Sequence, residues 1–127
     1  MSYAETILPE FDQEMASTRT VLERVPEEKL DWKAHPKLNT IGWNAAHVAE
    51  IPGYVERMLL QPEWDFAPPG GEAYVTPKLR TRKELLDFFD RNVAAARKAI
   101  LSIRDEAMSQ PWSPLLKVSQ AVSSGCR

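Results

Sequence analysis

The sequence lacks several features that whole classes of proteins need. Its 127 residues include a single cysteine, Cys126, so neither an intrachain disulfide nor a cysteine-rich metal cage can form. The 16 Lys and Arg residues are outnumbered by 18 Asp and Glu residues and are scattered along the chain, with no basic stripe. We therefore expect no nucleic-acid partner, because binding to phosphates needs clustered positive charge.

Long apolar runs are also missing. No stretch approaches the roughly 18 apolar residues that suggest a membrane-spanning helix. The N-terminal MSYAETILPEFDQEM carries acidic residues where a signal peptide has a basic segment and an apolar run. These features predict a cytoplasmic protein with no membrane partner. The length suits one domain over residues 1–127 with a single core.

Apolar residues recur at helical spacing in three segments, which predict core helices at about residues 6–25, 40–61 and 81–108. The tail, residues 109–127, has too few apolar positions for another full helix. We predict an all-α fold, an antiparallel up-down bundle of the four-helix type with the last helix shortened or missing. The apolar groove left open would need cover from the tail, from a loop or from a second copy, so a homo-oligomer is expected.

Capping residues and prolines set the expected ends of these helices. Thr6 or a nearby residue would cap the first helix and leave Pro9 in its first turn, where no intrahelical hydrogen bond is lost. Asn39 or Thr40 suits the start of the second helix, and Pro52 should bend its axis. Thr81, with Glu84 three residues later, forms a capping-box pattern for the third.

Two connecting segments carry aromatic side chains. In the connector 26–39, Leu30 and Trp32 are expected to plug one end of the bundle. The segment 62–77 has four prolines and two adjacent glycines, which favours a long loop. Its aromatic residues are expected to lie over the bundle, as loops of this length often form covers; they are Trp64, Phe66 and Tyr74.

His47 is the main candidate for chemistry, in the stretch WNAAHVAEIPGY. From the residues alone, a satisfied histidine at the edge of the core is the first interpretation and a metal ligand is the second. Glu50, one helical turn later, could share a metal or a water with His47, although a solvated face residue is the simpler interpretation. His35 lies beside Pro36 in a connector and is interpreted as a surface residue.

The other candidates are weaker. Trp43, Tyr54 and Trp64 could line a small-molecule pocket, or they could simply fill the core. Cys126 would be nucleophilic only if a helix start or a cation stabilised its thiolate, and an incidental thiol is the favoured interpretation. Neither a nucleophile-elbow nor a phosphate-loop pattern is present, so no catalytic residue is assigned.

Three stretches, LPEFDQEM, LDWKAHPK and TIGWNAAHVAEIPGYV, together resemble the DinB-like superfamily of bacterial four-helix bundles. The resemblance implies a divalent metal, nickel or zinc, held by three histidines. One of these comes from the second helix and two from an H-x-x-x-H pair in the last helix. Some members are S-transferases or isomerases that use low-molecular-weight thiols, so a small-molecule or thiol substrate is implied. By this match, His47 is the second-helix ligand.

The sequence departs from the family pattern in its histidines. Only His35 and His47 are present, and no H-x-x-x-H pair occurs. The resemblance therefore implies a relative of metal-dependent thiol S-transferases or hydrolases with an incomplete metal site and little or no activity. We expect that a truncation or frameshift removed the last helix. The alternative is a non-catalytic helical interaction module that oligomerises through the uncovered apolar groove.

Overall fold

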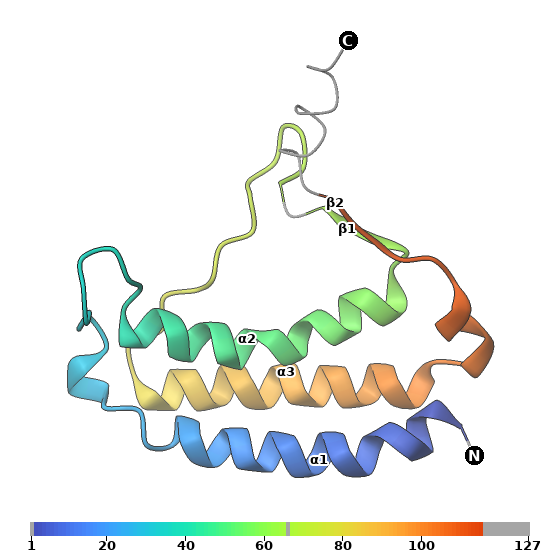
Figure 1. Ribbon diagram of the computed structural model, residues 1–127, viewed down its shortest axis with the longest axis horizontal. Coiled ribbons are helices and arrows are strands. Elements are labelled where there is room, and N and C mark those ends of the chain that lie inside the picture. The colour runs from blue at the N-terminus through green and yellow to red at the C-terminus, as the bar shows by residue number, and fades with distance from the viewer. Residues whose placement is uncertain (1, 66, 116–127) are drawn as a thin grey trace.

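The computed structural model describes residues 2–65 and 67–115. In this part of the chain, three long helices form a single layer: α1 (Tyr3–Leu22), α2 (Ile41–Leu60) and α3 (Arg82–Ser102), with α3 in the middle (Figure 1). The predicted all-α fold is thus confirmed. The minor elements are the 3₁₀ helices η1 (Glu27–Lys29) and η2 (Asp105–Ser109) and the strands β1 (Glu63–Asp65) and β2 (Ser113–Leu115).

Contacts between the helices fix their directions. Arg19 and Arg97 pair with Asp90 and Asp12 respectively, so α1 and α3 are antiparallel. Ala45 and Ala49 of α2 instead share a buried cluster with Leu85 and Phe89 of α3, and Gly53 lies against Asn92. Residue numbers therefore increase in the same direction along α2 and α3, so these two helices are parallel. In the predicted up-down bundle, consecutive helices would be antiparallel. The connection 61–81 makes this possible because it is long enough to return along α2 (Figure 1).

The start of α1 differs from the prediction. Ser2, not Thr6, is the N-cap, and it forms a capping box with Glu5. Pro9 consequently lies beyond the first turn, where its missing N–H deprives the carbonyl of Glu5 of a helical partner. Thr40 and Thr81 cap the other two helices, because their side chains each accept a hydrogen bond from the backbone three residues on. The predicted capping box at Thr81 is only half formed, because the carboxylate of Glu84 accepts from the N–H of Arg80 rather than from that of Thr81.

Two helices end earlier than predicted, and residues beyond each end contact distant parts of the chain. The backbone carbonyl of Val25 accepts hydrogen bonds from the guanidinium of Arg82, and α1 has already ended at Leu22. Helix α3 ends at Ser102 rather than near residue 108. The extended backbone after it carries Asp105 to the N-terminus of α1, where its carboxylate accepts a hydrogen bond from the N–H of Tyr3 at 3.0 Å.

The interface between α2 and α3 is built from small residues of α2. Ala45, Ala46 and Ala49 are buried, and a Cβ added to Gly53 would lie 2.8 Å from Oδ1 of Asn92. Val48 of the same helix is exposed. The alanine side of the helix faces α3 because it allows the closer approach and the denser packing. Pro52 lies inside α2 as predicted, and the second half of the helix bends away from α3 (Figure 1).

The connectors differ from the expectations in two ways. Trp32 is exposed and does not plug the bundle, whereas Leu30 is half-buried and its carbonyl accepts a hydrogen bond from Gly42. Segment 62–77 contributes strand β1, which pairs in parallel with β2. This pairing was not predicted, because three-residue strands carry no detectable alternation.

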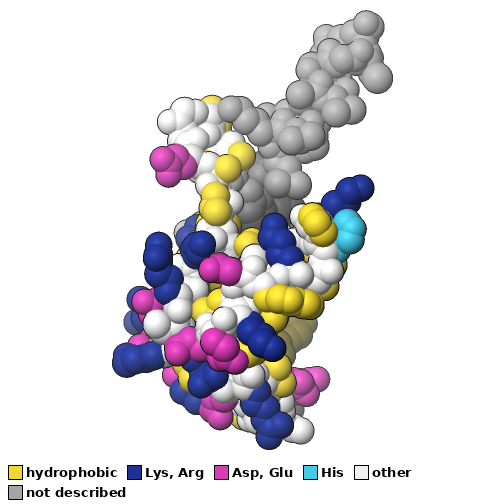
Figure 2. All heavy atoms as spheres, turned by 90° about the vertical axis from the view of Figure 1, so that its left-hand side faces the viewer, with side chains coloured by type: hydrophobic (Ala, Val, Ile, Leu, Met, Phe, Trp, Pro, Cys, Tyr) yellow, Lys and Arg dark blue, Asp and Glu magenta, His cyan; other side chains and the backbone are white. Residues whose placement is uncertain are grey.

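The surface has mixed charge. On the face shown in Figure 2, Lys and Arg side chains are interspersed with Asp and Glu side chains. Among the described helices, none has the length and apolar character needed to cross a membrane.

Candidate functional site

Glu50 of α2 is a buried carboxylate at the centre of a hydrogen-bond network. Its side chain is 1% exposed, and it accepts hydrogen bonds from the hydroxyls of Tyr74 at 2.5 Å and Thr76 at 2.6 Å. Nδ1 of His47 lies 2.7 Å from Oε1 of Glu50. The prediction that Glu50 is a solvated face residue is therefore wrong. Connection 61–81 covers this side of α2 and brings two hydroxyl donors to the carboxylate.

The network keeps Glu50 ionised. Burial by itself would raise the pKa of this carboxyl group, but hydrogen bonds from Thr76, Tyr74, His47 and Tyr54 outweigh burial and hold the pKa below its ordinary value. Burial and the neighbouring carboxylate of Glu50 raise the pKa of Tyr54 to about 12. The same two causes raise the pKa of Tyr74 further still. Both phenols therefore keep their protons near neutral pH and can act as donors.

His47 lies at the edge of this network. Its imidazole stacks on the indole of Trp43 with a centroid distance of 4.8 Å, and 40% of its side chain is exposed. Because an ionised carboxylate only accepts hydrogen bonds, Nδ1 carries the proton shared with Glu50. This geometry agrees with the first interpretation, a satisfied histidine at the edge of the core.

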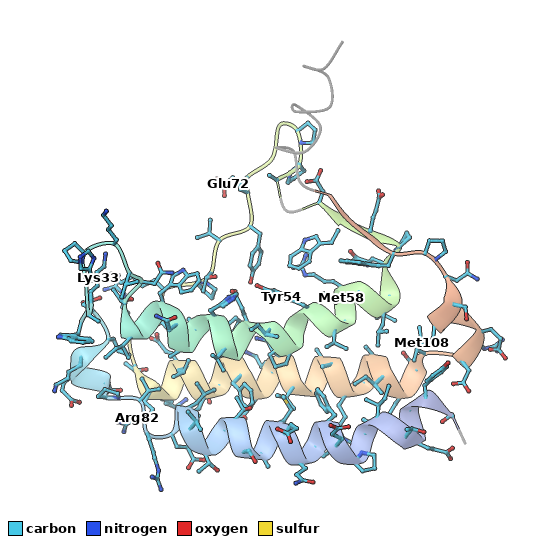
Figure 3. All side chains as sticks on the ribbon, in the orientation of Figure 1. Lys33, Tyr54, Met58, Glu72, Arg82 and Met108 are labelled. Atoms are coloured by element: carbon cyan, nitrogen blue, oxygen red, sulfur yellow. The ribbon has the colours of Figure 1, made fainter. Side chains whose placement is uncertain are left out.

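Three aromatic rings gather where connection 61–81 passes over α2. The centroid of Tyr54 lies 5.1 Å from that of Trp64 and 6.1 Å from that of Tyr74. Figure 3 shows Tyr54 between α2 and the returning connection. Trp64 is buried, as expected for an aromatic side chain laid over the bundle. Trp43, by contrast, lies apart from this group on the first turn of α2, and Phe66 is outside the described residues.

A groove of about 370 Å³ opens beside the network, between α2, α3 and residues 74–77. Sequence reasoning singled out Tyr54 in its lining but missed Tyr74, Thr76 and Arg57 as members of the site. Arg57 could have been found, because Glu50, Tyr54 and Arg57 follow one another at steps of four and three on one helix face. The polar and aromatic lining of the groove includes Glu50, Tyr54, Arg57, Tyr74, Phe88 and Asn92.

Comparison with protein families gives one decisive match. The family model of the DinB superfamily matches residues 10–121. The chain belongs to the DinB superfamily. The resemblance drawn from TIGWNAAHVAEIPGYV is thereby confirmed at the level of the family. No curated protein and no solved structure gave a significant match.

The described residues of this DinB protein do not fit a metal centre as they stand. A catalytic zinc site generally takes three protein ligands. Among the residues that the structure describes, no group of three His, Cys, Asp or Glu side chains could surround a metal ion. The carboxylate of Glu50 is already bonded to Tyr74, Thr76 and His47, and Oε1 receives two of these bonds, from Thr76 and His47. The role of His47 as a metal ligand stays a prediction.

The two remaining candidates are His35 and Cys126. His35 is exposed in the connector, as predicted, and its Nδ1 accepts a hydrogen bond from the backbone N–H of Lys37 at 3.1 Å. Cys126 and the predicted tail beyond residue 115 lie outside the described residues.

Proposed function

We propose that this DinB protein is related to metal-dependent thiol S-transferases and hydrolases, and that the region around His47 does not support metal-dependent catalysis. Transferase or hydrolase activity is then weak or absent. The observation that supports this proposal most strongly is that the carboxylate of Glu50 is already hydrogen-bonded to Tyr74, Thr76 and His47.

Recruiting Glu50 as a metal ligand would be costly. The hydroxyls of Tyr74 and Thr76 would lose their charged acceptor, and a hydrogen bond to a charged group contributes about 1.5–3 kcal/mol. The connection that carries both residues would have to move away from α2. His47 would still be the single imidazole of the site, since His35 lies in an exposed connector.

Calorimetric titration of tag-free protein with Zn²⁺ and with Ni²⁺ tests the proposal. We expect no binding in the nanomolar range or tighter, which is typical of structural zinc sites. The Cys126→Ser variant should behave like the wild type, which removes the thiol as a source of binding. Tight binding of one metal ion per chain that disappears in His47→Ala but persists in His35→Ala would refute the proposal.

A second candidate function is homo-oligomerisation without catalysis. Val48, Ile51 and Met58 are each more than 40% exposed. Helical spacing places all three on one face of α2, with His47 at its border. Exposed apolar residues that share a helix face are typical of interfaces between copies.

A further inference from the structure

We propose that the groove beside α2 binds a small organic monocarboxylate with an apolar body, and that Arg57 holds the carboxylate. This site is distinct from a metal site at His47, and the inference does not rest on the proposed loss of metal-dependent activity. It follows from the state of Arg57 and from the composition of the groove walls.

Arg57 is a cation held in place without an acidic partner. Its guanidinium carbon lies 4.5 Å from the ring centroid of Trp64 and 5.9 Å from that of Tyr74. Stacking on aromatic faces fixes the plane of a guanidinium group and leaves its N–H edge open for a planar acceptor. The guanidinium groups of Arg19 and Arg97 each form an ion pair with an aspartate, whereas Arg57 has no ion pair within the described part of the chain.

The remaining groove walls suit an apolar body. Phe88, Val75 and Pro77 provide apolar surface, and Asn92 adds an amide. The amide nitrogen of Asn92 already donates to the carbonyl of Ala49 at 2.9 Å, which orients its oxygen. A volume of about 370 Å³ lies at the lower end of the range for small-molecule sites and accommodates a ligand of about a dozen heavy atoms.

The charges of the groove limit the ligand to a single negative charge. Glu50 and Glu56 both line the groove, and neither forms an ion pair with Arg57 among the described residues. A dianion would meet two carboxylates and one guanidinium, and like charges at this range are unfavourable. A monocarboxylate can place its charge on Arg57 and its apolar part against Phe88.

Titration of the full chain with 3-phenylpropanoate, followed by NMR or calorimetry, tests the inference. The neutral amide 3-phenylpropanamide and the cation 3-phenylpropylamine have nearly the same shape and serve as matched ligands. We expect the carboxylate to bind at least about tenfold more tightly than either, because hydrogen bonds to charged groups contribute about 1.5–3 kcal/mol. A similar loss is expected for the carboxylate when Arg57→Gln replaces the wild type.

Two further variants keep the outcome clear. Arg24→Gln removes an exposed arginine beyond the end of α1, outside the groove, and should leave binding unchanged. If Arg57→Gln fails to fold, Arg57→Lys keeps the charge but loses the planar donor edge and should still weaken binding. The inference is overturned if the carboxylate does not bind, if the amide or the amine binds equally well, or if Arg57→Gln has no effect. None of these results bears on the metal titration.

Discussion

At the scale of single residues, Glu50 determines how the site is organised. Its burial and its ionisation are compatible because Tyr74, Thr76 and His47 supply hydrogen bonds that replace water. Through these bonds, a residue in the middle of α2 fastens a connection whose contacting residues lie 24 and 26 positions further along the chain.

Replacing Glu50 by Gln should therefore destabilise the protein. The amide keeps the volume, but its NH₂ group cannot accept the hydrogen bonds that one carboxylate oxygen now receives from Tyr74 or Thr76. We expect a loss of about 1–3 kcal/mol in the free energy of unfolding, measured by urea denaturation. Glu56→Gln, at an exposed position of the same helix, should change it by less than about 0.5 kcal/mol. Equal effects of the two substitutions would contradict this role of Glu50.

The contribution of Glu50 should also be visible in the pH dependence of the free energy of unfolding. The pKa of Glu50 in the folded protein is below its ordinary value of 4.5, so the unfolded chain binds the proton more readily. The stabilisation is therefore fully present above about pH 4.5 and is lost as the pH falls through the folded pKa. Unfolding free energies of wild type and Glu50→Gln should converge as the pH falls below about 4.5 and through the folded pKa.

Other acidic groups affect this comparison little. The pKa values of Asp12 and Asp87 are also lowered, by hydrogen bonds from Arg97 and Lys83 respectively. Both aspartates are present in wild type and variant, so their contributions cancel in the difference. A difference that stays constant with pH would show that folding does not lower the pKa of Glu50.

The residue scale also shows what the sequence could and could not reveal. The step of three between His47 and Glu50 correctly placed the two side chains within reach of each other. The burial of Glu50 could not be predicted from this spacing, because it depends on Tyr74 and Thr76, which reach it through tertiary structure alone. The family could be recognised because stretches such as TIGWNAAHVAEIPGYV are visible directly in the sequence, and the family model matches residues 10–121.

At the scale of elements, helix starts were more predictable than helix ends. Thr40 and Thr81 cap α2 and α3 through bonds to residues three positions away, which the sequence displays directly. The Ser2 and Glu5 capping box of α1 has the same local signature and could have been recognised. The ends of α1 at Leu22 and of α3 at Ser102 were instead predicted too far along the chain, at about residues 25 and 108.

Gly53 provides a test of how closely α2 approaches α3. Replacing a helical glycine by alanine normally stabilises a helix by about 1 kcal/mol. Here the new methyl group would lie 2.8 Å from Oδ1 of Asn92, so we expect Gly53→Ala to destabilise the protein. In an Asn92→Ala background, where the obstacle is gone, the same change should be stabilising. A double-mutant cycle by urea denaturation should give a coupling of about 1 kcal/mol or more.

A coupling near zero would contradict this packing. It would mean that Gly53→Ala acts through helix propensity alone and that Asn92 does not restrict the approach of the two helices.

At the scale of the whole molecule, a single layer of three helices leaves much of α2 uncovered. The parallel direction of α2 and α3 requires the long return connection, and this connection covers Glu50 but not the apolar face around Ile51. The all-α class was predictable from helical periodicity. The directions of the helices were not, because periodicity does not specify how a connection runs.

The uncovered face predicts self-association. Light scattering coupled to gel filtration should show a dimer or higher oligomer for the wild type. Ile51→Lys places a charge on the α2 face and should give a monomer with unchanged helix content by circular dichroism. Val21→Lys, at an exposed apolar position of α1, is the matched control and should leave the oligomer intact. A wild-type protein that stays monomeric at high concentration would contradict the hypothesis that the chain is an interaction module.

The most direct test of the account is a crystal structure of the tag-free protein grown with excess Zn²⁺, with anomalous data collected at the zinc edge. The account predicts that Glu50 still accepts hydrogen bonds from Tyr74 and Thr76, with no anomalous peak beside His47. A zinc ion bound by His47 and Glu50, with Tyr74 and Thr76 displaced from the carboxylate, would contradict it.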